Sequence, residues 1–200
     1  MTLDAPPHTL APTISPADAN LGAAPLPASA PFKPSKPFKP NAKFLLAHPA
    51  HFVALGFGSG LSPVAPGTAG TLWAWLAFLM LQPFVTNAQM GWLILGATLV
   101  GWWACTVTAK HMAVLDPGSI VWDEVVAFWL VLWLVMPAGL LGQFIAFVLF
   151  RFFDAAKPGP VGWADQHFKG PGARGGFGIL FDDFVAAFCT LLVIAAWRFW

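Results

Sequence analysis

Two long stretches of the chain carry no Asp, Glu, Lys or Arg: one runs from Phe44 to Ala109 and the other from Val125 to Phe150. Charged residues return in two clusters, residues 110–124 and 151–183. Long uncharged apolar stretches are typical of membrane-embedded helices. Ionised groups beside lipid are costly and are usually functional. The pattern therefore predicts a membrane protein whose chemistry lies at the edges of its apolar segments.

The uncharged stretches divide into four or five apolar helices. Pro66 and Gly67 predict the start of the first helix. The stretch Gln89–Thr108 is long enough to cross a bilayer core of about 30 Å. We therefore predict an all-α, multi-helical bundle embedded in the membrane. The expected helices are Gly67–Pro83, Gln89–Thr108, Ile120–Met136, the run that follows Gly139 and ends at Phe153, and Phe177–Trp200.

The segment Pro137-Ala138-Gly139 decides the topology. If it forms a turn, residues 125–150 are two short antiparallel helices, and both charged clusters lie at one face of the membrane. If it is only a kink, these residues form a single helix about 39 Å long, and the clusters lie at opposite faces. We favour the turn, because a Pro-x-Gly break is poorly tolerated inside a helix.

Composition sets the outer limits of the domain. Residues 1–43 are rich in Ala, Pro and Lys, and prolines at this density disfavour helix and sheet, so we expect a disordered tail. One helical domain over residues 44–200 follows. The net charge of +1 indicates no nucleic-acid partner, and no protein partner is evident. Cys105 and Cys189 lie in apolar runs and are interpreted as small hydrophobic residues.

Carboxylates stand at the ends of the predicted helices. Asp123 and Glu124 open one helix, and Asp154 closes the next. Asp182 and Asp183 open the last. Carboxylates crowded at low dielectric repel one another unless a cation neutralises them, and hard oxygen ligands suit Mg²⁺. The helix dipole alone explains Asp123 and Asp182 but not Asp154, which lies at a helix C-terminus. We therefore predict all five as catalytic residues and metal ligands.

Three basic residues accompany these carboxylates. Arg151 shares a helix face with Asp154, Lys157 follows shortly after, and Lys110 ends the second helix. Cations beside a metal-binding cluster indicate a polyanionic substrate, and arginine grips phosphate with two hydrogen bonds. We predict that all three bind the substrate phosphate. Ordinary salt bridges, or contacts with lipid headgroups, are the alternative.

The segment from Gly56 to Gly70 is rich in glycine, proline and hydroxyl groups. Backbone N–H groups in such a loop, leading into a helix N-terminus, form a cradle for an anion. The segment matches neither a Walker loop nor a dinucleotide-binding turn. We predict Ser59, Ser62 and Thr68 as phosphate-binding residues. A flexible linker at the membrane edge is the alternative.

Four sequence blocks occur in order: Gly56–Pro63 with Pro66-Gly67-Thr68, then Ser119–Glu124, Phe150–Pro158 and Gly175–Asp183. Together they resemble the signature blocks of bacterial phosphatidylglycerophosphatase A. The resemblance extends from about His51 to the C-terminus and leaves out the proline-rich tail. It departs at His111, where an Asp is expected, and in a longer loop before Gly176 that makes Arg174 an unsafe substrate ligand.

The resemblance implies Mg²⁺-dependent removal of the terminal phosphate of phosphatidylglycerophosphate, giving phosphatidylglycerol, at the bacterial cytoplasmic (inner) membrane. The lipid substrate and the bilayer are then the partners. The excess of Lys and Arg at the face with the charged clusters makes that face cytoplasmic. We expect a carboxylate to accept a proton from metal-activated water, while Arg151 and Lys157 offset charge on the phosphate.

A different class of function also uses carboxylates in membranes. A small transporter or channel could pass cations along the clustered carboxylates, but it requires ionisable groups near the middle of the bilayer. The predicted positions are helix ends instead. A Mg²⁺-dependent lipid-modifying transferase is excluded only by the resemblance.

Overall fold

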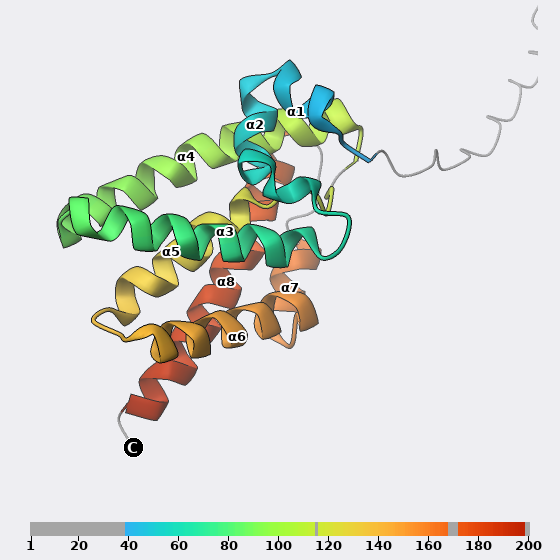
Figure 1. Cartoon of the computed structure of the whole chain (residues 1–200). Coiled ribbons are helices and arrows are strands. Elements are labelled where there is room, and N and C mark those ends of the chain that lie inside the picture. Colours follow the sequence, from blue (N-terminus) through green and yellow to red (C-terminus); the bar gives the residue numbers. More distant parts are fainter. Residues whose placement is uncertain (1–38, 115, 168–171, 199–200) are drawn as a thin grey trace, which may run out of the picture. The chain divides into compact units, whose positions relative to one another are not determined.

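The computed structural model describes residues 39–114, 116–167 and 172–198, and every regular element within them is a helix (Figure 1). The prediction of an all-α protein is confirmed. Residues 1–38 of the predicted tail and residues 199–200 lie outside the described residues. The elements are α1 (Ala42–Ala47), α2 (Pro49–Ala54), η2 (Gly56–Leu61), α3 (Pro66–Leu81), η3 (Gln82–Phe84), α4 (Asn87–Met112), α5 (Trp122–Val135), α6 (Leu140–Ala156), α7 (Pro160–His167) and α8 (Ala173–Arg198).

The five predicted long helices are all present, as α3, α4, α5, α6 and α8. The start of α4 is fixed by a capping box: the Thr86 hydroxyl accepts the backbone N–H of Gln89 at 3.3 Å, and the Gln89 side chain accepts the N–H of Thr86 at 2.8 Å. The helix continues past the predicted end to Met112. Lys110 and His111 in its last turn complement the helix dipole and favour this extension.

Three short helices, α1, α2 and α7, were not predicted, so the described residues hold more helices than expected. Each has only six to eight residues, too few for a helical repeat of apolar positions to be seen. Local chemistry defines their starts. The side chain of Asn41 accepts the N–H of Phe44 at 3.0 Å, and Pro49 and Pro160 occupy first helical positions.

The predicted start of the last helix was wrong. Helix α8 begins at Ala173, so Asp182 and Asp183 lie inside the helix and do not open it. The glycines of this first part suggested a loop. They instead permit close packing, because a Cβ on Gly176 would overlap with the side chain of Thr106 in α4. Tertiary contact here outweighs the low helix propensity of glycine.

Helix α5 is the central element and contacts α3, α4, α6 and α8 (Figure 1). Ten of its fourteen residues are buried, which matches its apolar sequence. Two tryptophans on α5 satisfy their indole N–H groups on neighbouring backbones. Trp129 donates to the carbonyl of Ala74 in α3 at 2.8 Å, and Trp122 donates to that of Ala97 in α4 at 2.9 Å.

The predicted turn at Pro137 is confirmed. Helix α5 ends at Val135, and α6 begins at Leu140. The guanidinium of Arg151, near the end of α6, lies 3.5 Å from the carboxylate of Glu124 at the start of α5. The two helices are therefore antiparallel and bring both charged clusters to one end of the fold.

Two helices, α4 and α8, are long and apolar enough to cross a membrane. Only 28% and 39% of the residues in their most apolar windows are buried. Large apolar side chains consequently face outward, among them Trp92, Leu95 and Leu99 on α4. A helix surface that faces water is usually polar. The apolar surface seen here suits contact with lipid.

Candidate metal centre

Three carboxylates converge where α5 meets α8. One oxygen from each of Asp123, Glu124 and Asp183 lies within 4.8 Å of the others. Glu124 and Asp183 are buried, and Asp123 is half-buried. Each of the three also has a buried oxygen with no hydrogen-bond partner. Buried polar atoms are rarely left without partners, so these oxygens fit a bound cation. An all-oxygen, anionic donor set is the type that Mg²⁺ prefers.

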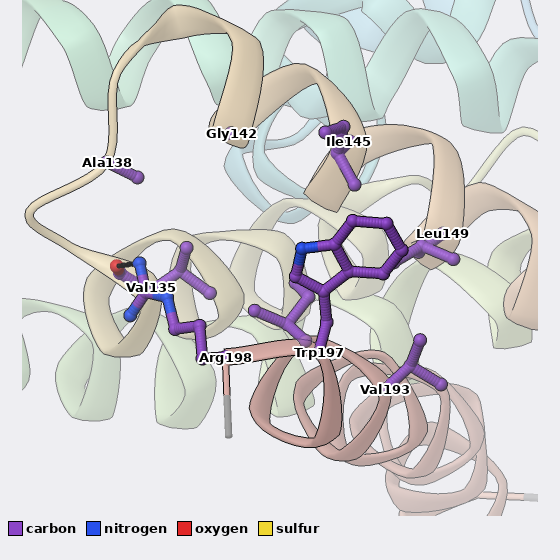
Figure 2. Close-up of a pocket in the computed structure, with 9 residues that line it drawn as sticks. Val135, Ala138, Gly142, Ile145, Leu149, Val193, Trp197 and Arg198 are labelled. Atoms are coloured by element: carbon purple, nitrogen blue, oxygen red, sulfur yellow. Dashed lines mark hydrogen bonds between the residues drawn. The ribbon is translucent and has the colours of Figure 1, made fainter. Parts of the chain in front are cut away.

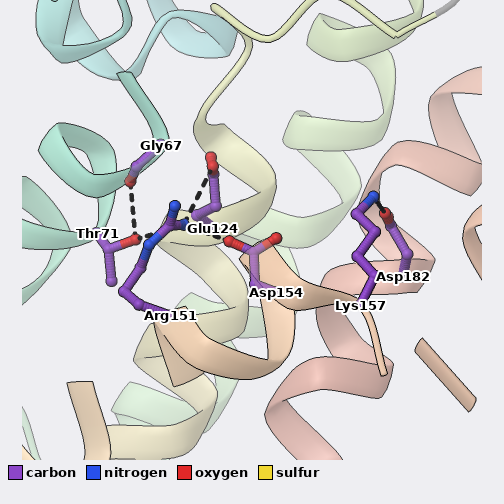
Figure 3. A network of polar contacts seen from close by, with 7 residues as sticks. All are labelled: Gly67, Thr71, Glu124, Arg151, Asp154, Lys157 and Asp182. Atoms are coloured by element: carbon purple, nitrogen blue, oxygen red, sulfur yellow. Dashed lines mark hydrogen bonds and ion pairs between the residues drawn. The ribbon is translucent and has the colours of Figure 1, made fainter. Parts of the chain in front are cut away.

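Arg151 forms a second group beside these carboxylates (Figure 3). It pairs with Asp154 one turn further along α6 and lies 3.5 Å from both Glu124 and the hydroxyl of Thr71. The Thr71 hydroxyl donates to the carbonyl of Gly67 at 2.9 Å. The Nε–H of Arg151 is buried and has no partner. Arg151 thus balances two carboxylates and keeps one donor for an anionic ligand.

Lys157 forms a third group at the end of α6. Its ammonium pairs with Asp165 of α7 and lies 2.6 Å from Asp182 of α8. Burial alone would lower the pKa of Lys157, but the two carboxylates outweigh burial and raise the pKa above its ordinary value. The lysine therefore stays charged. Asp165 was not among the predicted site residues, because its role depends on α7, a helix that the sequence pattern did not reveal.

The five predicted carboxylates thus form two overlapping sets. Asp123, Glu124 and Asp183 converge on one another, while Arg151 contacts both Glu124 and Asp154. Asp182 contacts Lys157 and keeps a second buried oxygen without a partner. Thr71, which fixes the position of Arg151, was not among the predicted site residues. Its signal in the sequence is its spacing of one helical turn from Gly67.

Two of the other predicted phosphate ligands are serines that hydrogen-bond within their own loop. The Ser59 hydroxyl donates to the carbonyl of Gly56 at 2.9 Å, and that of Ser62 donates to the carbonyl of Val64 at 2.8 Å, so both serve their own loop. Thr68 lies in the first turn of α3, next to Gly67. Lys110 is exposed in the last turn of α4.

Gly67 connects the loop to the carboxylates. A Cβ on this residue would overlap with the carboxylate of Glu124 and would lie 3.2 Å from both terminal nitrogens of Arg151. A side chain at this position would therefore require the Glu124 carboxylate to move away from α3 (Figure 3).

His111, where the resemblance leads one to expect Asp, has a structural partner. Its Nδ1 lies 2.8 Å from Nε2 of His51, and Nδ1 of His51 lies 2.8 Å from the carbonyl of Phe44. The carbonyl accepts from His51, so His111 donates to His51. Burial lowers the pKa of His51, which favours this neutral arrangement. The histidine pair joins α2 to the end of α4.

A groove of about 390 Å³ lies at the other end of α5 (Figure 2). Its lining is apolar apart from Arg198, whose guanidinium donates to the carbonyl of Val135 at 2.9 Å. None of the described residues that line this groove carries a carboxylate, so the converging carboxylates lie elsewhere.

The described residues define a class: a helical protein with outward-facing apolar helices and a carboxylate centre flanked by an arginine and a lysine. Such a centre suits a divalent cation together with a phosphate group. The sequence model of phosphatidylglycerophosphatase A matches residues 52–198. The chain therefore belongs to the phosphatidylglycerophosphatase A family and is a homologue of phosphomonoesterases.

Individual relatives agree with this assignment. The chain is 39% identical over 148 residues to phosphatidylglycerophosphatase A of Escherichia coli (strain K12), covering 73% of this chain and 81% of the relative. It is 38% identical over 160 residues to the protein of the same name from Haemophilus influenzae, covering 79% and 94%. A putative phosphatidylinositol-3-phosphatase of Bacteroides thetaiotaomicron is 36% identical over 155 residues, covering 73% and 91%. No solved structure matches the chain.

Proposed function

We propose that this protein is a Mg²⁺-dependent lipid phosphatase that hydrolyses the terminal phosphate monoester of phosphatidylglycerophosphate to give phosphatidylglycerol. The observation that carries the proposal is the convergence of Asp123, Glu124 and Asp183, each with an unpartnered buried oxygen. Membership of the phosphatidylglycerophosphatase A family supports the choice of substrate.

Each group of residues has its own part in the reaction. Asp123, Glu124 and Asp183 would hold Mg²⁺. When bound, Mg²⁺ would act as a Lewis acid on a phosphate oxygen and would lower the pKa of a bound water. Arg151 directs its unpartnered Nε–H to a phosphate oxygen and offsets the charge that develops there. Asp154 and Asp182 keep Arg151 and Lys157 oriented. Water would add to phosphorus as the ester P–O bond breaks. A carboxylate of the cluster would take up a proton from the water and return it to the departing glycerol oxygen, so that an alcohol and inorganic phosphate leave.

The surroundings of the site fit a lipid substrate. The outward apolar surfaces of α4 and α8 support insertion of residues 44–200 in the cytoplasmic membrane as one domain. The acyl chains then stay in the bilayer while the headgroup enters the site from the cytoplasmic face. In this proposal the tail outside the catalytic domain ends before Lys39, because Lys39 lines a cavity of the helical domain and α1 begins at Ala42.

Phosphate release from defined lipids in detergent micelles tests the function directly. The purified protein is expected to release phosphate from phosphatidylglycerophosphate with Mg²⁺ present, and EDTA should abolish the release. Phosphatidylinositol 3-phosphate, the substrate class named for the Bacteroides relative, serves as the competing lipid. Release that persists in EDTA, or preference for the inositol lipid, would contradict the proposal. A protein that carries cations without releasing phosphate would support the transporter alternative.

Replacement of Gly67 tests the link between the loop and the ion pair. Gly67→Ala is expected to lower kcat/KM by about 10- to 100-fold, because the added methyl group displaces Glu124 or Arg151. Gly96→Ala is the matched control, since a methyl group there meets no atom within 4 Å. Steady-state kinetics of both variants give the comparison, and equal activity of the two would refute the steric argument.

A further inference from the structure

A cavity of about 320 Å³ is lined by the loop that leads into α3. Its wall combines the glycine- and serine-rich loop with the segment that precedes α5 and with the start of the described chain. Its volume is at the small end of the range for small-molecule sites. The lining residues are Lys39, Pro40, residues 60–63, Pro66, Gly118 and Ser119.

We propose that this cavity binds the glycerol and phosphodiester part of the substrate headgroup, with Lys39 as the cation for the diester phosphate. The inference rests on the proposed function. It explains how the enzyme would distinguish phosphatidylglycerophosphate from other lipids that carry a phosphate monoester. In phosphatidylglycerophosphate only one glycerol separates the two phosphates. A monoester held at the carboxylates therefore places the diester in a neighbouring subsite.

The position of the cavity meets this requirement. Pro66 lines it, and Gly67, the next residue, packs directly against Glu124 and Arg151. Adjacent Cα atoms are about 3.8 Å apart, so the cavity wall at Pro66 adjoins the residue that packs against the ion pair. This proximity is what the proposal requires of a two-phosphate headgroup.

The distribution of charge also points to Lys39. Arg151 and Lys157 are each already paired with two carboxylates. Lys39 is exposed and has no ion-pair partner among the residues that the structure describes. It is the cation in the lining of this cavity, and the hydroxyl oxygens of the lining serines are acceptors for a glycerol, although Ser62 donates its own hydrogen to Val64. The family match begins at residue 52, so Lys39 adds a contact from outside the matched region.

Two substrates separate this subsite from the reactive centre. Phosphatidic acid has the phosphate monoester but no phosphodiester. Lys39→Gln is expected to lower kcat/KM for phosphatidylglycerophosphate about tenfold, mainly through KM, and to leave kcat/KM for phosphatidic acid unchanged. Lys39→Arg should restore most of the loss. Lys43→Gln is the matched control, because Lys43 is also exposed near the start of the described chain but does not line the cavity.

Three outcomes would overturn the subsite. The first is an equal loss of kcat/KM for both lipids, and the second is an equal loss in the Lys39 and Lys43 variants. Either would indicate only attraction to the micelle surface. The third is an unchanged kcat/KM in the Lys39 variant. A binding measurement makes the test independent of turnover. Glycerophosphoglycerol, a diester without a monoester, should protect Lys39 but not Lys43 from acylation, as read by mass spectrometry. If the wild type releases no phosphate, the proposed function fails, and this protection still decides whether the cavity binds a diester.

Discussion

Asp183→Asn is expected to lower Mg²⁺-dependent phosphate release by more than about 100-fold. Loss of a residue that only supports a metal ligand commonly lowers metal affinity or activity about 10- to 100-fold. Asp183 is proposed as a direct ligand, so its loss should cost more. The amide keeps the size of the side chain but removes the charge. Initial rates at several Mg²⁺ concentrations measure the effect, and excess Mg²⁺ should not restore the wild-type rate.

Thermal unfolding of the same variant separates lost chemistry from lost structure. Without metal, Asp183→Asn should be at least as stable as the wild type, because one of the crowded negative charges is gone. Added Mg²⁺ should raise the unfolding temperature of the wild type but hardly that of the variant. Asp116→Asn, which changes an exposed carboxylate outside the converging set, should behave as the wild type. Wild-type metal stabilisation in Asp183→Asn would exclude Asp183 as a ligand.

Arg151→Gln is expected to reduce both stability and activity. Removal of the guanidinium leaves Glu124 and Asp154 without their shared cation, and breaking a largely buried pair costs about 3 kcal/mol. Activity should fall as well, because the unpartnered Nε–H proposed for the phosphate is lost. Unfolding in detergent and kcat/KM for phosphatidylglycerophosphate measure the two effects.

Arg151→Lys distinguishes charge from geometry at this position. The ammonium restores part of the stability, but it cannot bridge two carboxylates and present a further planar donor, so activity should stay low. Arg198→Gln at the far end of the fold is the control and should cost about 1 kcal/mol with no change in kcat/KM. Wild-type kinetics in Arg151→Lys would show that Arg151 contributes charge alone.

The long helices could be predicted because their lengths follow from stretches without charge. The turn at Pro137 could be predicted because proline and glycine interrupt such a stretch. Helix α7 could not, since eight residues carry too little periodicity. The early start of α8 was missed for another reason. Gly176 packs against Thr106 of α4, and such a tertiary contact is not visible in the sequence.

The candidate site divides in the same way. Asp123, Glu124 and Asp183 could be selected because carboxylates are scarce and costly in an apolar chain. The ion pairs of Asp154 and Asp182 could not, because they depend on where Arg151 and Lys157 point in the folded protein. The hydroxyl groups of Ser59 and Ser62 show the opposite case. They were predicted as phosphate ligands from the composition of the loop. In the structure each donates to a carbonyl within its own loop.

The hydrogen bond from Arg198 to Val135 gives the pair α5 and α8 two unlike ends. At one end the helices are joined by a hydrogen bond from a cationic side chain, which needs no further ligand. At the other, Glu124 and Asp183 bring negative charges close together. A cation bound between these carboxylates would therefore give α5 and α8 a second cross-link, at the opposite end from Arg198.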